Sequence, residues 1–135
     1  MSVLKSNRNK SDIQFLETAR EIELFIYRIT KHFPKRYSYT LSAELIKLSQ
    51  SLLNNLKAAN SIYPTNAHEL QIRRDYWIYA NNSLQCLISQ CGVAKELATD
   101  VKSSSWEQLG LMLQDEAKLI SAVKASDMKR FSTLT

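Results

Sequence analysis

Turn-forming residues are scarce in this chain, and their scarcity limits the folds open to it. The 135 residues include two glycines and two prolines, whereas average usage would give roughly sixteen of the two types together. A protein built from many short strands needs frequent tight turns, for which glycine and proline are the usual residues. The sequence therefore excludes a many-stranded β protein and favours a few long helices.

Apolar residues recur every three or four positions in four segments, the spacing that places side chains on one face of a helix. The segments are residues 11–33, 40–60, 66–98 and 104–123. Each begins at a residue that can cap a helix, namely Ser11, Thr40, Asn66 and Ser104. Three of these have the capping-box spacing to a later glutamine or glutamate, namely Gln14, Glu69 and Glu107. Pro34 ends the first segment because proline cannot continue a helix.

Four helices joined by short loops predict one all-α domain. The expected architecture is an up-down-up-down antiparallel four-helix bundle over residues 11–124. Residues 1–10 are expected to form a basic, flexible N-terminal tail, and residues 125–135 a C-terminal tail that frays.

Residues for catalysis or metal binding are not grouped in any familiar pattern. His32 and His68 stand alone, and neither has a glutamate three positions before it, as a di-metal bundle site requires. The two glycines lie too far apart for a phosphate-binding loop. The sequence predicts a protein that is not an enzyme and has no metal or cofactor.

Three features of the sequence bear on where in the cell the protein is expected: its longest uncharged run, its N-terminus and its two cysteines. The longest uncharged run, residues 76–94, includes several amides and hydroxyls, so it is not expected to cross a membrane. The basic N-terminus is not followed by an apolar signal segment. Cys86 and Cys91 point in different directions from one helix and are expected to be buried, reduced thiols. These features predict a cytoplasmic protein with no membrane partner.

Positive charge is concentrated in the first half of the chain. Residues 1–65 have ten Lys and Arg against five Asp and Glu, and residues 66–135 have eight against eight. The excess lies partly in Lys5, Arg8 and Lys10, and partly in a turn that includes Arg28, Lys31, Lys35 and Arg36 among three aromatics. Cations neutralise phosphates and aromatic rings stack on unpaired bases, so these residues predict an RNA-binding surface. Alternatively, Phe33 and one tyrosine plug the bundle end and the cations are merely solvated.

Arg73 and Arg74, near the start of the third predicted helix, are two further candidates for the basic surface. Arg73 lies in phase with the core-facing stripe, where Glu69 or Asp75 is the expected partner of a structural ion pair. Alternatively, both arginines extend the basic surface, because the start of the third helix and the N-terminal tail share one end of an up-down bundle.

Several large apolar residues fall outside the predicted core stripes. They are Ile46, Leu53, Trp77, Ile88, Met112 and Leu119. Apolar patches on a surface usually mark interfaces, so these residues predict a partner-binding or homo-oligomeric surface. Wide core faces in a short bundle are the alternative explanation.

Four segments together resemble a known family. They are Phe33-Pro-Lys-Arg-Tyr37, residues 59–64 (ANSIYP), Arg73-Arg-Asp-Tyr76 and residues 84–90 (LQCLISQ). In these the chain resembles the accessory variability determinants, small four-helix-bundle proteins of diversity-generating retroelements, from about Asp12 to Arg130. Related four-helix-bundle proteins are encoded in intervening sequences of ribosomal RNA genes.

The resemblance implies a non-enzymatic accessory subunit. Its family members are basic, form pentamers, bind nucleic acid and associate with the reverse transcriptase of the same element. The expected partners are that enzyme, its template RNA or an RNA-DNA hybrid, and further copies of the chain, and the expected role is support of cDNA synthesis in mutagenic retrohoming. The resemblance assigns nucleic-acid contacts to Lys35, Arg36, Arg73 and Arg74. The alternative is a protein-interaction scaffold of the ribosomal intervening-sequence type, with no nucleic-acid role.

Overall fold

Four long helices make up most of the molecule. The computed structural model describes the backbone of residues 2–134 and the side chains of residues 13–134. The long helices are α1 (Ser2–Thr30), α2 (Ala43–Ser61), α3 (Ala67–Leu97) and α4 (Ser103–Arg130). Short helical turns are η1 (Lys35–Tyr37), the π-helical η2 (Ser38–Ser42) and η3 (Ser132–Leu134). No strand occurs among residues 2–134, so the all-α prediction is confirmed.

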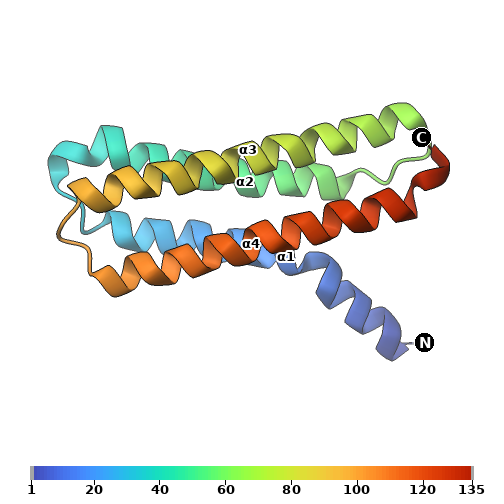
Figure 1. Ribbon diagram of the computed structural model, residues 1–135, viewed down its shortest axis with the longest axis horizontal. Coiled ribbons are helices and arrows are strands. Elements are labelled where there is room, and N and C mark those ends of the chain that lie inside the picture. The colour runs from blue at the N-terminus through green and yellow to red at the C-terminus, as the bar shows by residue number, and fades with distance from the viewer. Residues whose placement is uncertain (1, 135) are drawn as a thin grey trace.

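The helices pack side by side along their lengths. α1 lies against α2 and α4, and α3 lies against the same two helices. Figure 1 shows successive helices running in alternating directions, while the first turns of α1 extend away from the other three. This packing is compatible with the predicted up-down-up-down bundle. It places the α1–α2 turn beside the α3–α4 connection at one end, and the starts of α3 and α1 with the end of α4 at the other (Figure 1).

One of the four predicted N-caps is confirmed. Asn66 is in an extended conformation and its Oδ1 accepts a hydrogen bond from the Glu69 backbone N–H at 2.9 Å. The Glu69 carboxylate in turn accepts from the backbone N–H and hydroxyl of Thr65, at 2.8 and 2.7 Å. These bonds favour the charged form and lower the pKa of Glu69.

The other three helix starts differ from the sequence predictions. Thr40 lies within η2 and α2 begins at Ala43, while α4 begins at Ser103 without a side-chain cap. α1 begins at Ser2 rather than Ser11. A capping-box spacing is a local pattern, and residues 2–10 contain no glycine or proline that would stop the helix from continuing upstream.

The C-terminal segment also differs from the expected tail. α4 continues through residues 125–130, and Asp127 and the following Phe131 are buried. Phe131 packs edge-to-face on Tyr63, with ring centroids 5.7 Å apart. The end of the chain therefore packs on the loop between α2 and α3, and this contact explains its order.

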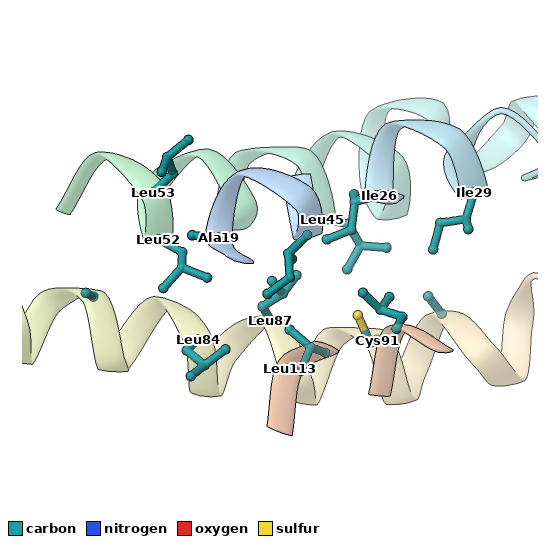
Figure 2. Packing of buried hydrophobic residues seen from close by; sticks show 14 of the residues in the cluster. Ala19, Ile26, Ile29, Leu45, Leu52, Leu53, Leu84, Leu87, Cys91 and Leu113 are labelled. Atoms are coloured by element: carbon teal, nitrogen blue, oxygen red, sulfur yellow. The ribbon is translucent and has the colours of Figure 1, made fainter. Parts of the chain in front are cut away.

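The core contains residues of the predicted stripes of all four helices, together with Leu53 and Trp77, which are predicted to lie outside those stripes. Figure 2 shows side chains from the four helices meeting between them, with Leu45 and Leu87 near the middle. The largest fully buried side chain is Trp77, and Phe15 packs on it edge-to-face at 5.4 Å. Burial of these residues is the main source of stability for such a fold.

The two thiols differ in accessibility, contrary to the prediction that both are buried. Cys86 is exposed and Cys91 is buried, where desolvation raises the pKa of its thiol to about 12. We expect iodoacetamide at pH 8 to modify Cys86 alone in the folded protein, and both thiols after unfolding in urea. Both cysteines lie in the tryptic peptide of residues 75–95, so tandem mass spectrometry of that peptide locates the modification. Equal modification of Cys91 in the folded protein would contradict the packing.

Candidate nucleic-acid interface

The connection between α1 and α2 is short and tightly wound. Its start is set by hydrogen bonds from the backbone N–H groups of His32 and Phe33 to the Ile29 and Thr30 carbonyls, each at 3.1 Å. Pro34 then takes an extended conformation, with φ −54° and ψ 142°, and the chain turns through η1 and η2 into α2. The residues between the two helices are therefore held in regular turns rather than in a long open loop.

Two of the three aromatic residues in this turn help to close the end of the core. Phe33 is buried against Trp106, with ring centroids 6.1 Å apart, and Tyr37 is half-buried against the core. The Arg36 guanidinium lies over the Tyr37 ring at 4.8 Å. The structural alternative is thus correct for Phe33 and Tyr37, whereas Tyr39 is 96% exposed and free to stack on a ligand.

Four cations precede the exposed tyrosine within eleven residues of the sequence. We call Arg28, Lys31, Lys35, Arg36 and Tyr39 the basic turn. All four cations are exposed, and none forms an ion pair within the part of the chain whose side chains are described. The neighbouring end of α3 and the α3–α4 connection add two exposed lysines and two exposed acids, Lys95, Lys102, Glu96 and Asp100, which cancel. Glu44 in the first turn of α2 is one further exposed acid against the four cations. The basic turn therefore keeps a positive excess on an accessible surface.

Arg73 lies at the opposite end of the molecule and is 5% exposed. Its Nε and Nη2 donate to the two carboxylate oxygens of Asp127 at 2.7 and 3.0 Å. Its Nη1 donates to the backbone carbonyls of Ala59 and Ile62, both at 2.8 Å. The prediction that Arg73 contacts nucleic acid is wrong, because its guanidinium is buried and bonded within the protein.

The partner of Arg73 also differs from the two expected acids. Glu69 is bonded to Thr65, and Asp75 accepts from the Gln71 amide at 2.9 Å. Asp127 instead holds Arg73 and also accepts from the indole N–H of Trp77 at 2.8 Å. This buried cluster joins α3, the end of α4 and the α2–α3 loop, so its role is structural.

The remaining predicted cations are not gathered on one surface. Arg74 is half-buried at the start of α3, at the far end of the bundle from the basic turn (Figure 1). Lys5, Arg8 and Lys10 fall outside the described side chains, so their predicted role stays a prediction. Only Lys31, Lys35 and Arg36 of the predicted contacts therefore share one described, exposed site.

The six residues of the predicted apolar interface differ in their exposure. Trp77 and Leu53 are buried in the core, because α3 and α2 each face two neighbours and need a wide apolar face. Ile46, Met112 and Leu119 are half-buried and pack against the core. Ile88 is 40% exposed and is the one member of the predicted set that is accessible.

Glu116 is a buried acid that belongs neither to the basic turn nor to the Arg73–Asp127 cluster. Glu116 on α4 is fully buried, and neither carboxylate oxygen has a hydrogen-bond partner among the residues whose side chains are described. Desolvation raises its pKa to about 8, so the group is mostly protonated at neutral pH. Its position three residues after Leu113 and four before Ile120 is a core position, and that phase is the sequence signal that identifies it.

No group of acids, histidines and cysteines in the described part of the chain is arranged to hold a metal ion. Within the same residues, no helix is long and apolar enough to cross a membrane. Comparison with models of known protein families and with curated proteins gives no match.

Proposed function

We propose that this protein is an RNA-binding accessory subunit and that the basic turn is its RNA contact. The observation that supports the proposal is the combination of two features. Four exposed cations have no ion-pair partner among residues 13–134, and the ring of Tyr39 is almost fully exposed. Cations bind the phosphate backbone, and an exposed ring stacks on an unpaired base. A single-stranded RNA segment satisfies both requirements, because its bases are free to leave the stack.

The biological setting of this proposal comes from the resemblance to accessory variability determinants. In that setting the protein is a cytoplasmic, non-enzymatic antiparallel four-helix bundle that forms a pentamer. It holds the reverse transcriptase of a diversity-generating retroelement and its template RNA, or an RNA-DNA hybrid, during cDNA synthesis. The basic turn supports the nucleic-acid part of this role, since two of its cations, Lys35 and Arg36, belong to a segment that resembles the family.

The basic turn predicts a salt-dependent affinity that charge reversal removes. We expect Lys31→Glu/Lys35→Glu/Arg36→Glu to weaken binding of a fluorescein-labelled 20-nucleotide oligo(U) RNA at least tenfold at 100 mM NaCl. The slope of the logarithm of the association constant against log [NaCl] should become shallower by about 2. This figure corresponds to three lost phosphate contacts at roughly 0.7 each. Fluorescence anisotropy between 50 and 300 mM NaCl measures both quantities.

A matched triple variant distinguishes a local site from net charge. Lys57, Lys118 and Lys129 are exposed and lie outside the basic turn, so Lys57→Glu/Lys118→Glu/Lys129→Glu makes the same change in charge. This control should lose much less affinity and keep most of the slope. Equal losses in the two variants, with both helical by circular dichroism, would show that RNA does not use the basic turn.

A protein-interaction scaffold without nucleic-acid binding is the second candidate. The observation in its favour is a set of exposed apolar side chains, of which Leu111 at 63% is among the most accessible. Partner binding through such a surface would be insensitive to salt, whereas RNA binding through the basic turn would not. An absence of RNA binding at 50 mM NaCl would favour this candidate.

A further inference from the structure

A groove lies between α3 and α4 at the end of the molecule opposite the basic turn. Its volume is about 200 Å³, and its lining residues are Arg74, Trp77, Ile78, Lys124, Asp127 and Met128. Three of these come from the start of α3 and three from the last turns of α4. The groove is therefore separate from the proposed RNA contact and is not assigned by it.

The floor of the groove is apolar and firmly held. Trp77 lies beneath it with 1% of its surface exposed, and the indole N–H is bonded to Asp127 at 2.8 Å. The Asp127 carboxylate is in turn paired with Arg73, so its charge is already neutralised inside the protein. A ligand in the groove thus meets the hydrocarbon of a rigid indole and finds no uncompensated acid there.

Two exposed apolar side chains extend this floor to the surface. Ile78 on α3 is 46% exposed and Met128 on α4 is 68% exposed. Met128 is flexible and polarisable, which suits it to pack against an incoming side chain. Together with the Trp77 floor, these residues form an apolar strip that has room for a large aliphatic side chain.

The rim of the groove is positively charged. Arg74 stands on the α3 side and Lys124 on the α4 side, and neither has an ion-pair partner among residues 13–134. The residues one turn before and after Arg74 on α3 are uncharged, namely Leu70, Gln71, Trp77 and Ile78. The one acid a turn from Lys124 is Asp127, and its charge is already paired with Arg73. The groove is thus complementary to a ligand with an apolar centre and acidic flanks.

We propose that this groove docks an acidic amphipathic helix of a partner protein. A leucine-sized side chain of the partner enters over Trp77, and acidic residues one turn away on either side pair with Arg74 and Lys124. Helix-in-groove recognition places the apolar anchors of an amphipathic helix in a groove of this kind. Complementary charges across the interface then fix its register and add specificity. Nucleic acid fits less well, because Trp77 is buried too deeply for a base to stack on its face. The groove and the basic turn lie at opposite ends, so the two partners do not compete.

The test uses a designed peptide as the probe. It is a 16-residue, N-acetylated and C-amidated helix with leucines at two positions one turn apart and glutamates one turn beyond them on either side. Titration into the ¹⁵N-labelled full chain, followed by NMR, should give saturable shifts at the Trp77 indole N–H, Ile78 and Met128. A peptide with serine in place of both leucines should bind at least tenfold more weakly.

Charge reversal provides the decisive comparison. A second peptide, with lysine in place of each glutamate, should bind the unaltered protein at least tenfold more weakly than the acidic one. It should regain affinity for Arg74→Glu/Lys124→Glu, which in turn should lose the acidic peptide. Lys57→Glu/Lys118→Glu is the matched control and should keep the preference for the acidic peptide, with all variants checked for helicity by circular dichroism.

Three outcomes would overturn the proposal. Equal binding of the acidic and lysine peptides would show that the rim does not select charge. Shifts of the same groove resonances by the oligo(U) RNA would assign the groove to nucleic acid. Concentration-dependent shifts there without peptide, abolished in Ile78→Ser/Met128→Ser, would assign it to a second copy of the chain. None of these results depends on whether the basic turn binds RNA.

Discussion

Asp127→Ala is expected to lower the free energy of unfolding by about 3–5 kcal/mol, the usual cost of removing one partner of a buried ion pair. The substitution removes the acceptor of three hydrogen bonds, two from Arg73 and one from the Trp77 indole. It leaves a guanidinium in a site that is 5% exposed, with no acid to neutralise it. Urea denaturation followed by circular dichroism at 222 nm measures the loss.

Two further variants separate the ion pair from ordinary surface effects. Asp115→Ala alters an exposed acid on the same helix and should change stability by less than about 0.5 kcal/mol. Arg73→Met/Asp127→Leu removes both charges and should recover much of the lost stability, because apolar replacement of a buried pair is often neutral. A loss below about 1 kcal/mol in Asp127→Ala would mean that Arg73 does not depend on this partner.

The Arg73–Asp127 pair also shows which features of a buried residue one sequence can predict and which it cannot. Burial of Arg73 follows from its phase with Tyr76 and Ala80 on α3, and that phase is a local property. Its partner lies 54 residues away, so no helical spacing can identify it. The sequence points to Glu69 and Asp75 only because they are near in the chain.

The basic turn and the predicted apolar interface also differ in how far local sequence determines their exposure. The basic turn is one continuous segment, so the exposure of Lys31, Lys35 and Arg36 depends little on how the helices pack. The burial of Trp77 depends on packing, since its indole lies between Phe15 of α1 and Asp127 of α4. A helical wheel places Trp77 beside the core stripe but does not show how wide the contact face is.

The order of the C-terminal segment has a similar explanation. Asp127 lies seven residues after Ile120, which is the helical repeat of a buried face, yet a charged residue in a lysine-rich segment suggests a solvated tail. The decisive contacts are those with Arg73 and of Phe131 with Tyr63, and both join segments distant in sequence. The seven-residue spacing from Ile120 therefore indicates that Asp127 is buried, whereas its charge indicates the opposite.

Glu116→Gln is expected to make the protein more stable at neutral and alkaline pH and to remove a pH dependence of stability. Burial raises the pKa of Glu116 from 4.5 to about 8 in the folded protein. Between these values the folded state holds a proton that the unfolded chain has released, so stability falls as the pH rises. The slope from this one group is about 1.4 kcal/mol per pH unit. Glutamine has nearly the same shape and no proton to lose.

The measurement is the difference in unfolding free energy between Glu116→Gln and the unaltered protein at pH 5, 6, 7 and 8. We expect this difference to grow with a slope that approaches about 1.4 kcal/mol per pH unit between pH 5 and 7 and becomes smaller near pH 8, where Glu116 begins to ionise in the folded state. Glu107→Gln is the matched control, because Glu107 is exposed on the same helix and should leave the pH profile unchanged. Parallel stability curves for Glu116→Gln and the unaltered protein would show that the Glu116 carboxylate reaches water or a partner in the folded state.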